Sequence, residues 1–284
     1  MILFSLLAAL VLLPERADAQ RDPAACPAPD TAGLLIRFLD IDQGDAALVR
    51  TSDGRLVLID GGPSESLLDA YLSRYRVGQL DLVVASHNHA DHIGGLPAAI
   101  QRIPVVNVLE NGMPATSRIY GRFVDAVARR GSRVLRPDAR TLTIGSASLQ
   151  VLPPWSGARE QNDASIGLVL RYGAFAALFT GDAEEGALDA WTGGGAIPRV
   201  AVVKVGHHGS RNATTEALVR AASPTLAVIS VGEGNTYHHP HPEALRRWAA
   251  PSRRIARTDR DGTVSVRGCR DGRFFVRTAR EETP

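Results

Sequence analysis

All eight histidines of this 284-residue chain lie in three short clusters, and the first cluster constrains the fold most strongly. It reads Ser86-His87-Asn88-His89-Ala90-Asp91-His92, so three histidines and one aspartate fall within six positions. Imidazole is the commonest metal ligand in proteins, and together with carboxylates it suits zinc, manganese and iron. The sequence therefore predicts a fold built around a metal site, with enough ligands side by side for two ions.

The residues before the cluster explain how it could present two ligand pairs. Residues 81–86 form an apolar run that reads as a short buried strand ending in a loop. His87 and His89, two positions apart in extended backbone, can point the same way. Asp91 and His92 follow where a helix is expected to begin. The alternative is a tract of surface histidines, but distant clusters at residues 205–210 (VGHHGS) and 237–242 (YHHPHP) offer compatible partners.

These motifs resemble those of a known family. The string H-x-H-x-D-H after an apolar strand is the signature of the metallo-β-lactamase superfamily, whose members are mostly binuclear metallohydrolases. The flanking motifs are similar to those of the hydrolase domain of the competence protein ComEC, in the same order from about Leu34 to Val276. They are DIDQGDA at 40–46, LIDGG at 58–62, TGD at 180–182, KVGHHGS at 204–210, the serine, asparagine and HP segment at 229–240, and a closing T…DG segment at 257–262. The resemblance implies an α/β fold of four layers, an αβ/βα sandwich.

The resemblance also implies a set of metal ligands. His87 and His89 would hold one metal, Asp91 and His92 the second, and Asp182 would bridge the two. The alternative for an aspartate at position 182 is an N-cap for the helix expected after it. Most binuclear members add a third histidine to the first metal, whereas this chain has no histidine between His92 and His207. Residues 161–165 occupy that place, with Asn162 as a weak oxygen ligand or a substrate contact, so the two divalent ions could be zinc or manganese.

The later motifs supply the remaining candidate residues. Of the two adjacent histidines, we expect His207 to bind metal and His208 to donate a proton to a leaving group, with Asp91 also taking part in catalysis. Lys204, the only lysine, and Ser210 could bind a phosphate together with backbone amides. Asp60 is expected to orient the ligating histidines. Asn235 and His239 match the family's asparagine and HP positions, while His238 and His241 are expected either at the surface or behind the site as supporting residues.

The ends of the chain carry a prediction about location. Residues 1–19 read as a signal peptide, with an apolar start and Ala17-Asp18-Ala19 as a cleavage site, although no basic residue precedes the apolar run. A retained N-terminal anchor is the alternative. We therefore expect a periplasmic or extracellular protein without a stable membrane partner, with a segment at 20–32 and one hydrolase domain at 33–280. Export would permit a disulfide between Cys26 and Cys269, the alternative being two free thiols.

Periodicity by itself predicts mixed α and β structure. The strands are expected at residues 34–39, 46–51, 55–59, 81–86, 105–109, 142–144, 148–152, 166–172, 174–180, 200–205, 226–231, 263–266 and 274–276. The helices are expected at residues 64–75, 93–102, 117–130, 183–191, 214–221 and 242–250. The two strand-rich halves, each with helices, fit the sandwich that the resemblance implies.

The function that follows is hydrolysis by two adjacent metals, which would lower the pKa of a bridging water and polarise the scissile group. The resemblance to ComEC implies a nuclease, so nucleic acid or another phosphodiester is the expected substrate. The net charge of +2 gives no polyanion-binding signal of its own. The alternatives are hydrolysis of a lactam, lactone or thioester at the same metals, or a metal-binding extracellular module without catalysis. The oligomeric state is not predicted.

Overall fold

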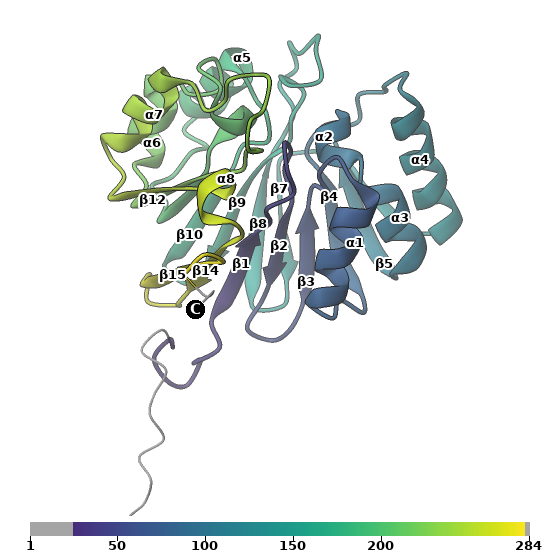
Figure 1. The fold of residues 1–284 in the computed structure, drawn as a ribbon, viewed down its shortest axis with the longest axis horizontal. Helices are drawn as coiled ribbons and strands as arrows, with labels where there is room; N and C mark the ends of the chain where they lie inside the picture. The colour runs from purple at the N-terminus through teal and green to yellow at the C-terminus, as the bar shows by residue number, and fades with distance from the viewer. Residues whose placement is uncertain (1–24, 282–284) are drawn as a thin grey trace, which may run out of the picture.

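The computed structural model describes residues 25–281, in which fifteen strands form two sheets (Figure 1). The first sheet has strand order β15-β14-β1-β2-β3-β4-β5-β6. Its strands are β1 (Leu34–Phe38), β2 (Ala47–Arg50), β3 (Leu56–Ile59), β4 (Leu80–Ala85), β5 (Val105–Glu110), β6 (Arg133–Leu135), β14 (Val264–Gly268) and β15 (Phe274–Thr278). The second sheet, in order β13-β12-β11-β10-β9-β8-β7, contains β7 (Arg140–Ile144), β8 (Ala147–Leu152), β9 (Gly167–Tyr172), β10 (Phe175–Phe179), β11 (Val202–Lys204), β12 (Leu226–Ile229) and β13 (Arg254–Arg257).

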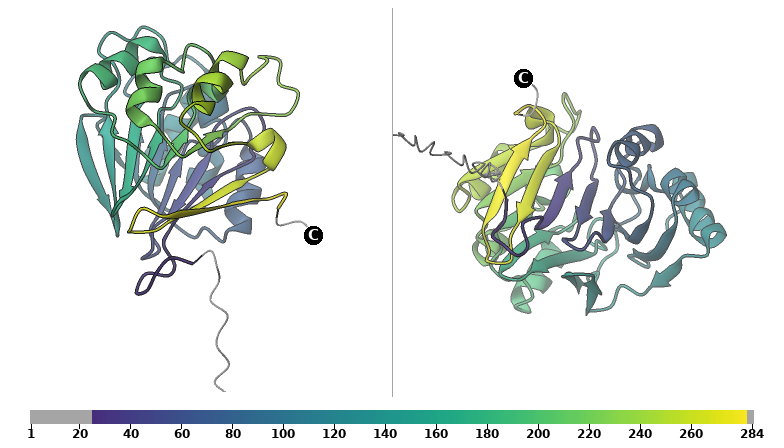
Figure 2. Two further views of the ribbon diagram at one scale, coloured as in Figure 1. Left: turned by 90° about the vertical axis from the view of Figure 1, so that its left-hand side faces the viewer. Right: turned by 90° about the horizontal axis from the view of Figure 1, so that it is seen from below.

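The helices cover the outer faces of the two sheets. The first sheet carries α1 (Glu65–Arg74), α2 (Ala90–Ile93), α3 (Leu96–Arg102) and α4 (Arg118–Arg130), and the second carries α5 (Glu185–Gly193), α6 (Glu216–Ala222) and α7 (Pro242–Ala249). A 3-10 turn, η1 (Gly206–Gly209), follows β11, and a short helix, α8 (Thr258–Asp261), follows β13. The predicted four-layer αβ/βα sandwich is therefore confirmed. The two views of Figure 2 show the two sheets facing each other.

Three buried apolar clusters hold the layers together. The central cluster lies between the sheets and includes Ile36, Phe38 and Phe179. One outer cluster packs α1, α3 and α4 on the first sheet, and the other packs α5, α6 and α7 on the second. The sequence pattern accounts for this arrangement, because β1 alternates buried and half-exposed residues while β10 is buried at every position.

The site residues follow strands that end at one edge of the sandwich. β3 and β4 are parallel neighbours, and Asp60 and Ser86 come directly after them. β10 and β11 are parallel neighbours in the other sheet, followed within a few residues by Asp182 and His207. Because the carboxyl ends of parallel strands meet at the same edge of a sheet, the topology gathers these side chains from distant parts of the chain.

The structure differs from the sequence-based expectation at several places, among them the short helix α8 and the turn η1, which were not predicted. The helix expected at 93–102 is split into α2 and α3 at Gly94-Gly95. A Cβ on Gly95 would lie 2.3 Å from the carbonyl oxygen of Gly61, so this close backbone contact excludes any other residue. The edge strands β6 and β13 were not predicted, because they are short and each contains arginine.

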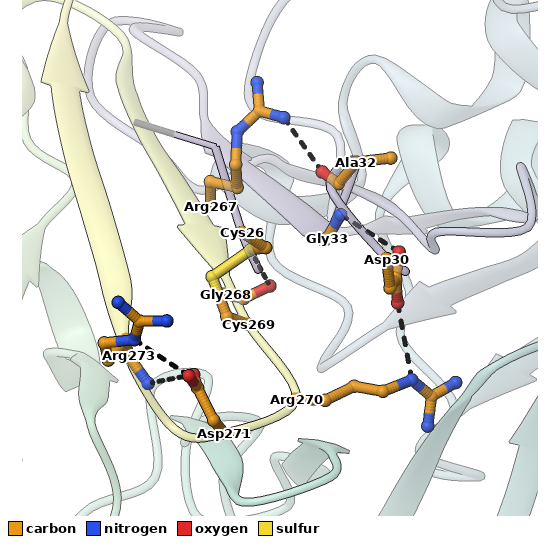
Figure 3. The surroundings of a disulfide bond; sticks show 10 residues. All are labelled: Cys26, Asp30, Ala32, Gly33, Arg267, Gly268, Cys269, Arg270, Asp271 and Arg273. Carbon is orange, nitrogen blue, oxygen red and sulfur yellow. Dashed lines mark hydrogen bonds and ion pairs between the residues drawn. A yellow bond between two sulfur atoms is a disulfide. The ribbon is translucent and has the colours of Figure 1, made fainter. Parts of the chain in front are cut away.

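A disulfide joins Cys26 to Cys269, which confirms the first of the two alternatives (Figure 3). The bond ties the segment before β1 to the turn between β14 and β15. Asp30 supports the same junction by accepting hydrogen bonds from the backbone N–H of Gly33 and the guanidinium of Arg270. The predicted signal peptide lies outside the described residues, and none of the helices within residues 25–281 is long and apolar enough to span a membrane.

Candidate metal centre

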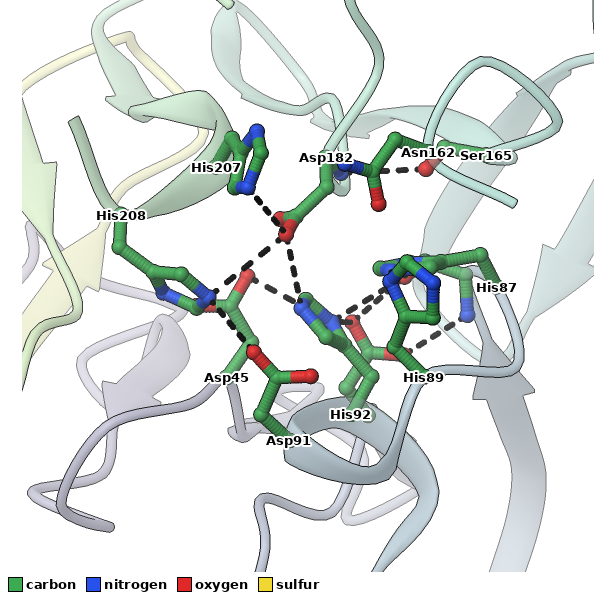
Figure 4. A network of polar contacts seen from close by, with 12 residues as sticks. Asp45, His87, His89, Asp91, His92, Asn162, Ser165, Asp182, His207 and His208 are labelled. Atoms are coloured by element: carbon green, nitrogen blue, oxygen red, sulfur yellow. Dashed lines mark hydrogen bonds and ion pairs between the residues drawn. The ribbon is translucent and has the colours of Figure 1, made fainter. Parts of the chain in front are cut away.

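The site lies where the loops after β4, β10 and β11 meet (Figure 4). The loop after β4 carries His87, His89, Asp91 and His92, the loop after β10 carries Asp182, and η1 carries His207 and His208. In the figure the imidazoles and carboxylates point toward a common centre. The sequence analysis predicted that separate segments of the chain contribute to one site, and the structure brings these segments together.

Asp60 organises the histidine loop. Its carboxylate accepts hydrogen bonds from the backbone N–H of Ser86 at 2.7 Å and from the Ser86 hydroxyl at 2.8 Å. The same carboxylate lies 2.9 Å from Nδ1 of His92, which directs Nε2 of that ring toward the centre. Asp60 thus has the orienting position expected from the sequence.

His87 and His89 point at a common position. Nε2 of His87 lies 3.1 Å from Nδ1 of His89, and the two rings meet edge to face. His87 is fully buried, and its Nδ1 lies 3.1 Å from the Ser86 hydroxyl. The chain bends at residues 86–88 and is not extended there as the sequence suggested, yet the spacing of two still brings these two nitrogens together.

A second group of ligand atoms comes from Asp91, His92, Asp182 and His208, and these atoms all lie within 4.8 Å of one another. Oδ2 of Asp182 is 3.2 Å from Nε2 of His92 and 3.6 Å from Nε2 of His208. Nε2 of His208 is also 3.3 Å from Oδ2 of Asp91. Glu184, not Asp182, occupies the N-cap position of α5, so Asp182 is not used as a helix cap.

The donor set fits divalent metal ions. Nε2 of His92 and Oδ1 of Asp182 are buried atoms without a hydrogen-bond partner among the described residues. Buried polar atoms are normally satisfied, so two such atoms beside the other ligand atoms fit a site for a cation. Imidazole nitrogens and carboxylate oxygens are the ligand types that zinc and manganese accept. The residues that could hold metal are His87, His89, Asp91, His92, Asp182 and His208.

The electrostatics without metal show how much positive charge the site demands. Burial opposes the charged form of His92, but the carboxylates of Asp182 and Asp60 outweigh it and hold the pKa of His92 well above its usual value. Burial likewise opposes the charged form of His208, while Asp182 and Asp45 raise its pKa to about 9. Burial lowers the pKa of His87, helped by the neighbouring His92. In the metal-free protein the carboxylates therefore favour the protonated forms of His92 and His208, and a bound metal would displace these protons.

The structure places His207 and His208 in the opposite arrangement from the one we expected. His208 is buried, with Nδ1 3.0 Å from the carbonyl oxygen of Ser230 and Nε2 among the ligand carboxylates. His207 stands at the wall, 23% exposed, with Nε2 3.8 Å from Asp182. Both residues have left-handed backbone, with φ of 46° and 52°, a strained conformation of the kind that clusters at functional sites. Sequence spacing could not foresee this turn.

Lys204 and Ser210 also lie elsewhere than the sequence suggested. Lys204 is 4% exposed and forms a close ion pair with the buried carboxylate of Asp45. The Ser210 hydroxyl, also buried, donates to Oδ1 of Asn212. Neither residue lines the pocket above the metal ligands, so their placement does not support the phosphate contact expected from the sequence. Lys204 instead neutralises a carboxylate behind the site.

The open side of the centre is a pocket of about 360 Å³. Its wall is mainly polar and includes Gln43, His89, Asn162, His207, Tyr237 and His239. The amide nitrogen of Asn162 donates to Oε1 of Glu184, which leaves its buried Oδ1 without a partner among the described residues. Burial, together with His207 and His208, lowers the pKa of His239 to about 4.

The remaining predicted residues support the pocket from behind or lie outside it. Asn235 holds the loop that carries His239, donating to the carbonyl oxygen of His239 and accepting from its backbone N–H. His238 is exposed, and Nδ1 of His241 accepts from the backbone N–H of Arg211. His238 therefore lies at the surface, whereas His241 is half-buried and supports the segment after η1, so the two residues take one each of the two expected positions.

Sequence reasoning missed several residues that shape the site. Asp45 was noted only as part of a motif, yet it lies 3.3 Å from His208 Nδ1 and pairs with Lys204. The Oε1 atom of Gln161 accepts from the backbone N–H of Asn88 and so braces the histidine loop. Glu184 lies 3.3 Å from Nδ1 of His207. The one sequence signal for this arrangement is that the only lysine, Lys204, lies close to the pair His207 and His208, which indicates an ion pair with a buried carboxylate.

Comparisons with known proteins agree with the fold and the site. Residues 39–233 match the model of the metallo-β-lactamase superfamily. The chain is 30% identical over 259 residues to ComE operon protein 3 of Bacillus subtilis (strain 168), covering 82% of this chain and 33% of that protein. It is 28% identical to Recombination protein 2 of Haemophilus influenzae, covering 85% of this chain and 30% of that protein. The chain thus spans about a third of the length of these relatives.

Solved structures show the same fold at low identity. CmlA β-hydroxylase (E377D mutant) aligns with a TM-score of 0.55 at 18% identity, covering 85% of this chain and 54% of that one. A long-form RNase Z from yeast aligns with a TM-score of 0.53 at 13% identity, covering 85% of this chain and 42% of that one. With the family model spanning most of the chain and the histidine loop in place, the protein belongs to the metallo-β-lactamase superfamily.

Proposed function

We propose that this chain is an exported hydrolase that uses two divalent metal ions to cleave phosphodiester bonds in nucleic acid. The observation that carries the proposal is the convergence of six ligand side chains beneath an open polar pocket. His87 and His89 would hold one ion, and Asp91, His92 and His208 the other, with Asp182 between them. Bound there, two divalent ions would activate a water molecule and neutralise phosphodiester charge.

The protein residues around the ligands have tasks of their own. Asp60 and the carbonyl oxygen of Ser230 fix the rings of His92 and His208, so that the ligand nitrogens face the centre. His207 stands at the pocket wall next to Asp182 and can donate a proton to the leaving oxygen, the task first expected of His208. His239 lines the same pocket and can donate a hydrogen bond to a non-bridging oxygen, while Oδ1 of Asn162 can accept one from the substrate.

The choice of phosphodiester over lactam rests on the character of this wall. Imidazole, amide and hydroxyl groups surround the opening, and they suit the several acceptor oxygens of a phosphate. The resemblance of the motifs to ComEC supports the same choice. Export is supported by the Cys26–Cys269 disulfide, because disulfides persist mainly in oxidising compartments.

The test is metal analysis of the purified chain followed by assays on single-stranded DNA, duplex DNA, RNA, bis(p-nitrophenyl) phosphate and nitrocefin. We expect about two ions per chain and cleavage of nucleic acid with manganese at least as well as with zinc. His89→Ala should abolish cleavage, whereas His238→Ala, which changes an exposed histidine, should leave it unchanged. Turnover of nitrocefin without cleavage of any phosphodiester would overturn the proposal.

A further inference from the structure

Within residues 25–281, the helices of the first sheet cover only part of its outer face. The helices α1, α3 and α4 pack on the sheet on the side of β2 to β5, whereas β14 and β15, at the other end of the sheet, are seen nearly end-on in Figure 1 and along their length in Figure 2. On β1 and β14, residues that alternate with the core point outward. The uncovered strands and the end of α1 enclose a groove of about 200 Å³.

The groove is lined by four arginines, which are Arg37, Arg74, Arg267 and Arg277, together with the aromatic rings of Tyr75 and Phe275. None of the residues that line it in the described chain is acidic. The whole chain has a net charge of only +2, so this concentration of guanidinium groups is local. We call this surface the arginine groove.

Strand pairing fixes the spacing of the charges. Arg37 of β1 lies opposite Ser265 of β14, which in turn lies opposite Arg277 of β15. Neighbouring strands are about 4.8 Å apart, so the backbones of the two arginines are separated by roughly 10 Å. Because arginine side chains are long, the two guanidinium groups can contact one phosphate or successive phosphates of a chain.

The aromatic residues of the groove favour nucleic acid over other polyanions. The guanidinium of Arg37 lies 4.2 Å from the centre of the Tyr75 ring, which orients the charge at the groove. Phe275 lies opposite Arg267 on the neighbouring strand. Alternating guanidinium and aromatic groups suit single-stranded nucleic acid, because phosphates contact the arginines while bases stack on the rings.

We propose that the arginine groove binds a single strand of nucleic acid outside the catalytic pocket and holds a long substrate on the enzyme. The groove shares no lining residue with the metal pocket. This inference rests on the proposed function for its choice of ligand. It deepens that function by assigning long single strands, rather than mononucleotides, as the preferred substrate.

The test is fluorescence anisotropy of the full metal-loaded chain with a 20-nucleotide single-stranded DNA made uncleavable by phosphorothioate linkages. The groove variant is Arg74→Glu/Arg277→Glu, since both side chains are exposed. The control is Arg133→Glu/Arg136→Glu, an identical charge change at the opposite edge of the same sheet. The groove variant should bind about tenfold more weakly and show a salt slope reduced by about one to two.

The outcomes separate this inference from the proposed function. Hydrolysis of bis(p-nitrophenyl) phosphate should be the same in wild type and both variants, because that substrate is too small to reach the groove. If the groove variant binds DNA as tightly as the control variant, the inference is overturned even when DNA is cleaved. Displacement of the DNA by polyglutamate at equal charge concentration would also overturn it. If wild type binds DNA through the groove but cleaves no phosphodiester, the groove stands and the proposed function fails.

Discussion

Two of the three loops that build the metal centre, those after β4 and β11, are constructed differently. The histidine loop after β4 carries four candidate ligands within six positions, and one residue, Asp60, orients both Ser86 and His92. The η1 loop provides one buried ligand, His208, through two consecutive left-handed residues. Its ring is held from outside the loop by Ser230 and Asp45. A compact ligand motif is therefore encoded locally, whereas a single distant ligand depends on the surrounding fold.

Asp182 is the point at which the two loops meet, and its removal should have the largest effect. Its carboxylate lies close to both His92 and His208. We expect Asp182→Ala to lower metal content and to slow cleavage by about a thousandfold or more, since the loss of metal catalysis is worth several kcal/mol. Metal analysis and kinetics check this, with Asp189→Ala on α5 as the control. Full metal content in Asp182→Ala would show that the loops bind metal independently.

The second prediction compares the two neighbouring histidines of η1. His208→Ala should lose metal from the second site, while His207→Ala should keep its metals and lose proton transfer, which is worth about a hundredfold or more. Metal content therefore separates the two variants even where their rates are similarly low. If His207→Ala loses metal and His208→Ala retains it, then His207 is the metal ligand and His208 the proton donor, as the sequence analysis expected.

The sequence predicted the first loop better than the second for a physical reason. In the first loop, four candidate ligands lie within six positions and a short helix begins among them, so His87 to His92 could be read directly from the sequence. In the second loop, the roles of His207 and His208 depend on their positive φ values. That backbone conformation belongs to a turn in which Gly209 packs against Pro240, a contact between distant residues that local sequence does not reveal. The four layers were predicted through the resemblance, while the edge strands β6 and β13 lacked an apolar pattern.

The third prediction concerns the support behind the second loop. Lys204 and Asp45 form a buried ion pair next to His208. Removing one partner of a buried pair leaves an uncompensated charge, so Lys204→Met should lower the free energy of unfolding by about 3 kcal/mol. Urea unfolding of the metal-free protein measures this, and the double variant Lys204→Met/Asp45→Asn should regain part of the loss. If the Lys204→Met protein is stable but binds DNA much more weakly, Lys204 contacts the substrate, as the sequence analysis expected.

The fourth and smallest effect is a pH dependence that distinguishes the loops. In the metal-free protein Asp182 and Asp45 overcome burial and raise the pKa of His208 to about 9 from an ordinary value of 6.5, whereas burial lowers the pKa of His87. The raised pKa stabilises the metal-free fold fully below pH 6.5, and this contribution is lost as the pH rises through 9. A metal that binds His208 and His92 must displace the protons on both imidazoles, so affinity at that site should rise at least tenfold per pH unit between 7 and 9. The site at His87, already neutral at pH 7, should show no such rise. Calorimetric titration with zinc in buffers of different ionisation enthalpy measures the protons released, and equal release in wild type and His208→Gln would contradict the assignment of His208 as a ligand.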